Sequence, residues 1–412
     1  MKKKHLKILA ISQVYYPDTA SVSQHLTDLL EALSYKGHDV TAYSSIRDYE
    51  NSKKTYLKNE IINNVKIHRI KNTGFGKKNK VSRLLDFFTF NVLIFFKLLF
   101  IKKSKFDLII GMTSPPLLSY FGLKIARFKK IKFVYWTMDL QPELSIVANY
   151  IEQGSKTALL LQKRGDFVFK FSDKIIVLDS FMKKHIVDRI GNRDNEIDVV
   201  PVWPVVNKLF VGERLSNPFR IENNFKEKIV IMYSGNHSVM HPLTTLLDAA
   251  VLLRDDHRFL FVHIGGGVKL NEVLEYKEMY NLKNVITLPY QPRENIHISL
   301  GSADLQVVSL GDKCTGFTHP NKIYGSMFIG KPILYIGPTH SHISEILNEC
   351  PGNISVKHGD ANLLVELLYQ FEKTKQLDKD LIGESNKIFA NKYFHPKKLI
   401  EKMTDSIESV IN

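Results

Sequence analysis

The sequence predicts an α/β protein built from two doubly wound domains, each with a parallel sheet covered by helices. Short apolar runs alternate with helical patterns along the whole chain, and this alternation is interrupted once, shortly after residue 200. The length of 412 residues also exceeds the roughly 250–300 residues that one hydrophobic core usually serves. With 44% hydrophobic and 24% charged residues, the composition excludes disordered, collagen-like and low-complexity chains.

The first half contains the elements of one parallel sheet. The run KILAIS at 7–12 predicts a buried first strand, and the apolar spacing from about Gln24 to Tyr35 predicts a helix that ends at Gly37. Further strands are expected at VTAYSS (40–45), FDLIIGM (106–112), KFVYWTM (132–138), KIIVLD (174–179) and EIDVVPV (196–202). This order is that of repeated βαβ units.

A stretch rich in turn-forming residues, from Pro201 to Pro218 and including Asn207, separates the two halves. The second series of strands then opens with IVIMYSG at 229–235 and continues with FLFVHIGGG, NVITLPY, ADLQVVSL, KPILYIG and GNISVKH. We therefore expect an N-terminal domain at 1–205 and a C-terminal domain at 206–388. Residues 389–412 are expected to form a helix that packs back on the N-terminal domain.

The charge of the chain is unevenly distributed. Residues 1–200 hold 34 Lys and Arg against 19 Asp and Glu, whereas residues 201–412 hold 23 of each, so the net charge of +15 comes from the first half. The first half is expected to face anionic lipid, nucleic acid or a phosphorylated substrate; a solvated basic surface is the alternative. Nucleic acid is not expected as a partner, because no helix-turn-helix, zinc or RNA-stacking motif occurs.

Two cysteines, Cys314 and Cys350, are too few for a disulfide framework, and no Cys/His group has zinc-ligand spacing. No D-x-D pair suited to a divalent cation stands at a strand end. We expect a cytoplasmic protein with no metal and no cofactor.

The run FFTFNVLIFFKLLFI at 87–101 differs from the rest of the chain. It is too short to span a bilayer, which needs about 20 apolar residues. Its basic flanks, at Lys77, Lys78, Lys80 and Arg83 before it and Lys102, Lys103 and Lys105 after it, favour an interfacial helix on an anionic membrane. The membrane contacts are expected from Phe95, Phe96, Phe100, Lys102 and Lys103. A buried or domain-packing helix is the alternative.

The predicted strand ends carry the motifs that bear on function, because ligands of open α/β sheets bind there. In the second half these motifs are YSGNH at 233–237, HPL at 241–243, YQPRE at 290–294, ADL at 303–305, GFTHPNKIYGSMFIGKP at 316–332 and IGP at 336–338. In the first half they are YPD at 16–18, GHDV at 37–40, TSPP at 113–116 and MDLQPE at 138–143.

This ordered set, which covers the whole chain, resembles the retaining glycosyltransferases of family four, and within them the WbuB-like branch of cell-surface polysaccharide biosynthesis. The resemblance implies a GT-B fold, in which two Rossmann-like domains face a central cleft. It implies a nucleotide-diphosphate-sugar as the donor. It also implies front-face substitution, in which the leaving phosphate accepts the proton of the acceptor.

Independently of the resemblance, the chemistry of a diphosphate indicates one residue as a contact of the donor. Glycosyl transfer develops negative charge on the departing phosphate, so a cation is needed, and a helix N-terminus suits it. Lys322 in HPNKIYG meets both conditions; a solvent-exposed loop lysine is the alternative. Arg293 is a candidate for a second cation. The donor contacts that we expect come from Gly235, Asn236, His241, Arg293, Pro320, Asn321, Lys322 and Tyr324.

The sequence departs from the broad family at two pairs of positions. Asn236 and His241 stand where many members have arginine and lysine, so that a fixed charge becomes a group that titrates near neutrality. Phe317 and Gly325 stand where many members have two glutamates. The WbuB-like branch shares this glycine, so we interpret it as a trait of the branch.

Asp139 and Glu143 are the catalytic candidates of the first half. Both follow the strand at 132–138, at the edge where ligands bind. A carboxylate there could orient the acceptor hydroxyl or stabilise the oxocarbenium-like charge. Capping of the following helix is the alternative for Asp139.

The expected activity is transfer of a hexosyl or N-acetylhexosaminyl group, with retention, to a polyprenyl-diphosphate-linked acceptor. O-antigen, capsule or exopolysaccharide would be the product, and the protein would lie on the inner face of the plasma membrane. Two alternatives remain: a GT-B nucleotide-sugar epimerase, and a non-catalytic membrane-associated scaffold of the same fold.

Overall fold

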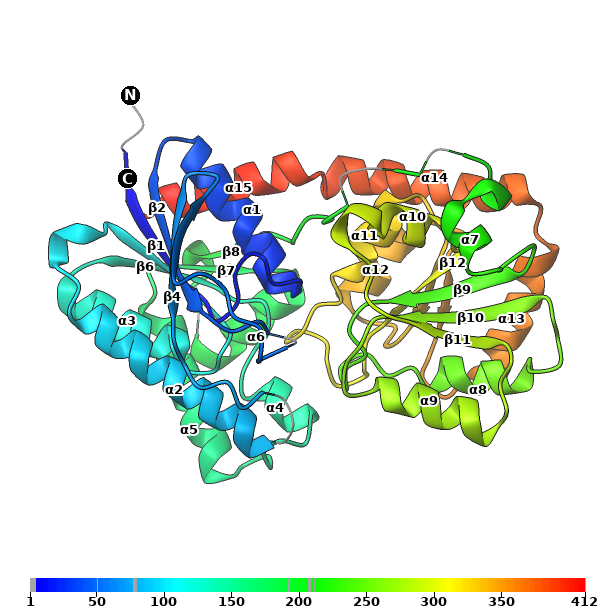
Figure 1. Cartoon of the computed structure of the whole chain (residues 1–412), viewed down its shortest axis with the longest axis horizontal. Coiled ribbons are helices and arrows are strands. Elements are labelled where there is room, and N and C mark those ends of the chain that lie inside the picture. The colour runs from blue at the N-terminus through cyan, green and yellow to red at the C-terminus, as the bar shows by residue number, and fades with distance from the viewer. Residues whose placement is uncertain are drawn as a thin grey trace. The chain divides into compact units, whose positions relative to one another are not determined.

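The computed structural model describes residues 5–49, 51–76, 80–191, 193–206, 209–210 and 212–411. Lys77 and Lys78 of the expected basic flank, and Asn207 of the expected linker, lie outside the described residues. The chain divides into two compact units, Met1–Val202 together with Lys397–Asn412, and Trp203–Pro396. Figure 1 shows both units and labels most of their helices and strands.

The first unit is built on an eight-stranded sheet of order β3-β4-β2-β1-β5-β6-β7-β8. All neighbouring strands are parallel except β3, which is antiparallel to β4. The pair formed by β3 and β4 was not expected from the sequence, because NEII is short and half exposed. The strands are β1 (Lys7–Ile11), β2 (Asp39–Ser45), β3 (Asn59–Ile62), β4 (Val65–Ile70), β5 (Leu108–Met112), β6 (Lys132–Trp136), β7 (Lys174–Val177) and β8 (Ile197–Val199).

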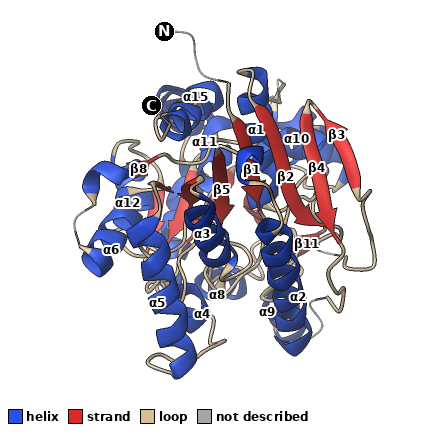
Figure 2. Cartoon of the chain, turned by 90° about the vertical axis from the view of Figure 1, so that its left-hand side faces the viewer, coloured by secondary structure: helices blue, strands red, loops and turns tan. Residues whose placement is uncertain are grey.

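Helices cover the sheet of the first unit, and α5, α3 and α2 lie side by side over it (Figure 2). Leu9, Ile11 and Ile109 of the sheet pack with Phe90 and Ile94 of α2 in one buried cluster. The helices are α1 (Ser21–Tyr35), α2 (Lys80–Leu99), α3 (Leu118–Lys129), α4 (Glu143–Val147), α5 (Lys156–Phe171) and α6 (Ser180–Ile190), with the 3₁₀ turns η1 (Lys103–Lys105) and η2 (Asp194–Glu196).

The last helix, α15 (Pro396–Glu408), packs on the first unit although it follows the second in sequence. Its apolar side chains Met403 and Ile407 are fully buried. Lys36, directly after α1, forms an ion pair of 2.8 Å with Asp405. The hydroxyl of Ser406 donates to a carboxylate oxygen of Asp198, on β8, at 2.6 Å.

The second unit has a six-stranded, wholly parallel sheet of order β11-β10-β9-β12-β13-β14. Buried clusters lie on both of its faces, as is typical of parallel sheets. The strand order reverses between β9 and β12, and the carboxyl ends of those two strands form the switch point at which ligands bind. The strands are β9 (Ile229–Ser234), β10 (Phe259–Ile264), β11 (Val285–Leu288), β12 (Leu305–Ser309), β13 (Ile333–Ile336) and β14 (Ile354–Val356).

The helices of the second unit follow the strands in the expected alternation. They are α7 (Pro218–Glu222), α8 (Thr244–Leu252), α9 (Leu270–Met279), α10 (Ile296–Gly301), α11 (Lys322–Phe328), α12 (His342–Asn348), α13 (Ala361–Lys373) and α14 (Gln376–Tyr393), with the 3₁₀ turns η3 (Arg214–Ser216) and η4 (Arg293–Asn295).

Candidate functional site

β9 ends in a turn that requires glycine. Gly235 directly follows this strand and has a φ of +139°, a conformation that residues with a side chain rarely adopt. A Cβ atom at this position would lie 3.3 Å from Cε of Lys322. The glycine therefore allows the turn and leaves room for the lysine beside it.

Lys322 is the first residue of α11, as the sequence predicts. Its Nζ donates a hydrogen bond of 2.7 Å to the hydroxyl of Tyr233 and lies 4.1 Å from the centroid of that ring. Among the described residues, no carboxylate forms an ion pair with Lys322. Burial lowers the pKa of Lys322 to about 7, because desolvation disfavours the charged amine. The switch point of the second unit thus holds an amine that an anion would stabilise in its charged form.

His241 lies near this amine but does not supply a second cation. Its Nδ1 lies 2.7 Å from the carbonyl oxygen of Ser309, the last residue of β12, and a carbonyl can only accept, so Nδ1 carries the proton. Burial, and then the charge of Lys322, hold the pKa of His241 well below its usual value. His241 is therefore neutral at pH 7, which corrects the expectation of a group that titrates near neutrality.

Two glycine turns are interlocked beside Lys322. The N–H of Gly235 donates to the carbonyl of Ile264 at 2.9 Å, and the N–H of His237 donates to the carbonyl of Gly266 at 2.7 Å. A Cβ atom on Gly267 would collide with the main chain of His237. The loop after β9 is therefore held by the loop after β10, and its main chain has a fixed position.

The other expected donor residues differ in their placement. Asn236 is exposed in the turn after β9, and Arg293 is exposed at the start of η4. Pro320 is buried, and Asn321 occupies the N-cap position of α11.

The position of Tyr324 in the core contradicts the prediction that this residue contacts the donor. It is 1% exposed, and its hydroxyl lies 2.6 Å from Nε2 of His319. Its ring packs 4.5 Å from that of Phe394, measured between centroids. Residues two positions apart on a helix do not share a face, so Lys322 reaches the end of β9 while Tyr324 points into the core.

Asp139 and Glu143 lie after β6, at the carboxyl end of the first sheet. Asp139 is half-buried. Glu143 is bound by two side chains of α6, with 2.9 Å to Nε2 of His185 and 2.8 Å to Nη1 of Arg189. Burial alone would raise the pKa of Glu143, but these partners outweigh it and hold the pKa below its usual value. Both contacts are made by Oε1 of Glu143, whereas its Oε2 is buried and has no hydrogen-bond partner in the described part of the chain. The catalytic role expected for Glu143 stays a prediction.

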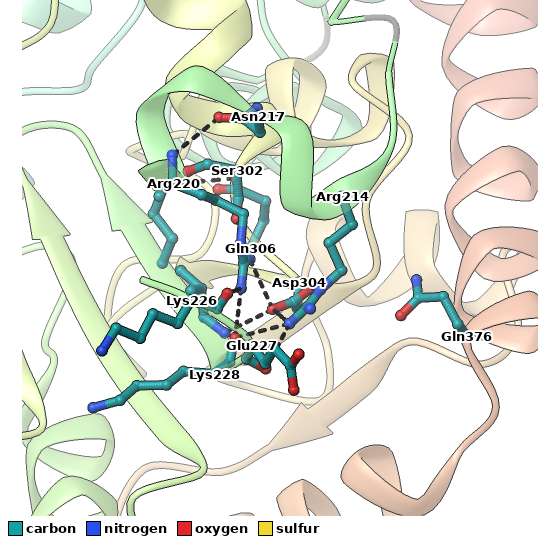
Figure 3. Close-up of polar contacts among 12 residues, drawn as sticks. Arg214, Asn217, Arg220, Lys226, Glu227, Lys228, Ser302, Asp304, Gln306 and Gln376 are labelled. Atoms are coloured by element: carbon teal, nitrogen blue, oxygen red, sulfur yellow. Dashed lines mark hydrogen bonds and ion pairs between the residues drawn. The ribbon is translucent and has the colours of Figure 1, made fainter. Parts of the chain in front are cut away.

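Asp304 also has a structural role (Figure 3). It directly precedes β12, so it lies at the amino end of the strand, away from the switch point. Its carboxylate accepts hydrogen bonds from Arg214 Nη2 at 2.8 Å, from Arg220 Nη1 at 3.1 Å and from the N–H of Val230 at 2.8 Å. These contacts fix η3 and α7 to the sheet.

The outer side of α2 is apolar. Phe96 is 50% exposed and Phe100, just after the helix, is 81% exposed, whereas Phe95 is partly buried with its ring 5.8 Å from that of Phe121. Adjacent helical residues point about 100° apart, so Phe95 packs inward, which corrects its expected membrane contact. Lys102 and Lys103 are exposed beyond the helix end. Further large apolar side chains exposed on α2 are Val81, Leu84, Leu85, Phe88 and Leu93.

Aromatic contacts continue from α2 across α3 to α5. Ring centroids of Tyr120 on α3 and Phe167 on α5 are 5.5 Å apart. The guanidinium of Arg164 lies 5.2 Å from the Tyr120 ring, and that of Arg127 lies 4.6 Å from the ring of Phe171. We call the outer sides of these three helices the α2–α3–α5 face. No helix in the described part of the chain is both long and apolar enough to cross a membrane.

Sequence reasoning missed Tyr233, because a tyrosine inside an apolar strand gives no sign that its hydroxyl meets a distant lysine. It also missed Arg189 and His185, which follow Glu143 by more than 40 residues. The exposed Phe88 could have been found from the helical period of the apolar run.

Comparison with known proteins agrees with this architecture. Residues 22–202 match the model of Glycosyltransferase Family 4. Together with the two doubly wound sheets, this match defines the class: a protein of the GT-B fold whose residues 22–202 are similar to Glycosyltransferase Family 4.

Among solved structures, Anabaena HepE in complex with UDP and glucose has a TM-score of 0.72 at 14% identity, over 98% of this chain and 100% of that one. Sucrose-phosphate synthase from Thermosynechococcus elongatus has a TM-score of 0.78 at 13% identity, over 98% and 99%. At these identities the likeness shows the fold alone.

Two relatives are similar in sequence. The probable glycosyltransferase WbjE of Pseudomonas aeruginosa is 23% identical over 253 residues, which are 60% of this chain and 63% of WbjE, so less than two thirds of that relative is covered. The putative colanic acid biosynthesis glycosyl transferase WcaI of Escherichia coli K12 is 21% identical over 361 residues, 84% of this chain and 87% of WcaI.

Proposed function

We propose that the protein is a retaining glycosyltransferase that transfers a sugar from a nucleotide-diphosphate-sugar to a polyprenyl-diphosphate-linked acceptor in cell-surface polysaccharide assembly. The observation that carries this proposal is the amine of Lys322. It lies at the switch point of the second sheet, beside a glycine turn, and no described carboxylate neutralises it. Such an amine suits the negative charge that develops on a departing diphosphate.

The transfer that we propose needs few other groups. The anomeric carbon loses its bond to the diphosphate oxygen while the acceptor oxygen binds on the same face, and the leaving phosphate takes the acceptor's proton. Lys322 stabilises the departing charge, and Asp139 orients the acceptor hydroxyl. Glu143 is a second candidate for orienting the acceptor hydroxyl, through its Oε2, because His185 and Arg189 both bind Oε1.

The relatives support the choice of substrates. The solved HepE structures contain UDP, UDP with glucose, and UDP-glucose, and WcaI is described as a colanic acid enzyme. A nucleotide sugar as donor and a polysaccharide precursor as acceptor are consistent with both.

The α2–α3–α5 face supports a peripheral position on the inner face of the plasma membrane. It combines exposed Phe96 and Phe100 with cations packed on aromatic rings at Tyr120 and Phe171. Apolar burial and attraction to anionic lipid together give interfacial binding. A lipid-linked acceptor would then be met at the bilayer surface.

The test has two stages. Thermal unfolding with UDP-, GDP- and dTDP-sugars identifies the donor, since a ligand of the native state raises its stability. The selected sugar is then offered with polyprenyl-diphosphate saccharides in vesicles, and the anomer of the product is determined by NMR. Donor-dependent elongation of the lipid with retention is the expected result. Interconversion of the nucleotide sugar without acceptor would favour the epimerase, and binding without turnover of any acceptor would favour the scaffold.

A further inference from the structure

Tyr233 connects the amine of Lys322 to the main chain of the loop after β9. Tyr233 is fully buried. Its hydroxyl donates to the carbonyl oxygen of Asn236 at 2.7 Å and accepts from Nζ of Lys322 at 2.7 Å. The hydroxyl has one proton, which the carbonyl takes, so its lone pair faces the amine. Lys322, Tyr233 and Asn236 form one directed chain of hydrogen bonds.

The far end of this chain is fixed by neighbouring structure. Asn236 lies between Gly235 and His237, whose N–H groups donate to the carbonyls of Ile264 and Gly266. The stem of Lys322 passes Gly235 so closely that a Cβ atom there would lie 3.3 Å from Cε. Displacement of the amine would therefore break the bond to Tyr233 without any other described partner to replace it.

Three described neighbours of Lys322, namely Tyr233, His237 and His241, have pKa values displaced away from neutrality. Burial raises the pKa of Tyr233 above its usual value. Burial lowers the pKa of His237 to about 4 and holds that of His241 well below its usual value. At pH 7 to 8 these neighbours are neutral, and the charge of Lys322 is compensated by no described carboxylate.

We infer that Tyr233 is a positioning residue that holds the Lys322 amine for the diphosphate of the donor, and that binding of the diphosphate charges this amine with a proton taken from solvent. The inference rests on the proposed function and goes beyond it, because it assigns a role to Tyr233 and couples donor binding to one protonation. The proton binds to the lone pair of Nζ, and no other bond changes.

The mechanism has a physical cause. Before the ligand arrives, burial favours the neutral amine, and the pKa of Lys322 lies at about 7. A bound diphosphate places negative charge beside Nζ, which favours the ammonium. At pH 8 the amine of Lys322 should be mostly unprotonated in the free protein, so binding should take up about one proton per nucleotide.

The experiment is calorimetric titration of the full chain with UDP, with GDP and with dTDP, in HEPES and in Tris at pH 7 and pH 8. The difference in heat between the buffers gives the number of protons taken up. Lys322→Arg, which stays charged, should bind without proton uptake. Tyr233→Phe keeps the ring and removes the hydroxyl. It should weaken binding at least about tenfold, and uptake at pH 7 should increase from about half a proton towards one.

Tyr276→Phe is the matched control, because it removes a tyrosine hydroxyl that donates to Asp248 at 3.2 Å between α9 and α8. Thermal unfolding establishes that each variant is folded. If Tyr233→Phe matched Tyr276→Phe in affinity and in proton uptake, the positioning role would be wrong. Binding to the wild type without proton uptake would overturn the coupling alone. Failure of the wild type to bind any of UDP, GDP and dTDP would overturn the proposed function, and this inference with it.

Discussion

Arg220 and Asp304 form an ion pair of 3.1 Å in which the two side chains are 2% and 6% exposed. The same carboxylate accepts from Arg214 and from the N–H of Val230. One side chain at the amino end of β12 therefore joins the segment that enters the second unit to two strands of its sheet.

Asp304→Asn should destabilise the second unit by about 3–5 kcal/mol, because removing one charge of a buried pair leaves the other uncompensated. Glu272→Gln is the control: it breaks the more exposed pair with Lys269 at 2.9 Å and should change stability little. Chemical unfolding followed by circular dichroism measures both. Equal midpoints for the two variants would contradict the role of Asp304.

The pair should also make stability depend on pH. Burial alone would raise the pKa of Asp304, but the hydrogen bond from Arg214 and the charges of Arg220 and Arg214 outweigh it and lower the pKa. Its contribution is therefore complete above the unfolded value of about 3.9 and is lost as the pH falls through the lower folded value. The difference in stability between wild type and Asp304→Asn should be constant from pH 7 to pH 5 and shrink below pH 4. If the difference in stability between wild type and Asp304→Asn instead increased as the pH fell, the predicted direction of the pH dependence would be wrong.

Lys322→Ala should leave the fold intact and lower kcat by about 10²–10³-fold, by analogy with the loss of a donor to a developing oxyanion. Lys313→Ala, which changes an exposed lysine in the preceding loop, is the control and should retain normal turnover. Steady-state rates with the donor identified by the binding screen test this. Comparable turnover in the two variants would remove Lys322 from the mechanism.

The pH profile should separate Lys322 from His241. The ammonium form is needed, and the pKa of Lys322 is about 7, so kcat/KM for the donor should fall as the pH rises above 7. His241→Asn should keep this fall, because His241 is neutral throughout that range. Lys322→Arg should abolish it. A profile that flattened in His241→Asn and not in Lys322→Arg would assign the titration to the histidine.

The sequence predicts much of the fold, because a buried parallel strand is a continuous apolar run that ends in a turn residue. IVIMYSG predicts both β9 and the glycine turn at Gly235, and Pro320 with Lys322 predicts the start of α11. The sequence could not show that Tyr233 meets Lys322, since 89 residues separate them. The ion pair of Glu143 with Arg189 could not be predicted either, because 46 residues separate the two side chains in sequence.

Helix orientation explains two other errors. Tyr324 lies two residues after Lys322 in the same motif, but the helical rotation directs it to His319 in the core. Phe95 and Phe96 are equivalent in composition, yet only Phe96 is on the outer side of α2. A motif identifies a segment, and the packing of that segment decides which of its side chains are available to a ligand.

Deletion of residues 397–412 should destabilise the first unit. Met403 and Ile407 are fully buried there, and each is worth about 1.5–3 kcal/mol of burial. The shortened chain should lose the thermal transition of the first unit or show it at a clearly lower temperature, while nucleotide binding by the second unit is retained. Lys36→Ala, which removes the ion pairs with Asp405 and Glu408 and leaves the buried apolar contacts of α15 in place, should have a small effect. If the thermal transition of the first unit were unchanged in the shortened chain, α15 would not be needed for the stability of that unit.

The membrane prediction follows from the exposed side of α2. Replacing Phe88, Phe96 and Phe100 with serine should release the protein from liposomes of anionic lipid, because it removes the exposed rings that would enter the lipid. These rings are 65%, 50% and 81% exposed, so their replacement should change the stability of the fold little. Exposed Lys102 and Lys103 should add about 1 kcal/mol each near an anionic surface, so salt should weaken binding without abolishing it.

The control variant replaces three exposed apolar side chains of α14 with serine. These are Leu377, Leu381 and Ile388, which are 70%, 60% and 62% exposed. Nucleotide binding should be normal in both variants, since all six residues lie away from Lys322 in sequence and none contacts it. Sedimentation with vesicles should then separate the two triple variants, and loss of binding in the α14 variant alone, or in neither, would place the membrane contact elsewhere than on the α2–α3–α5 face.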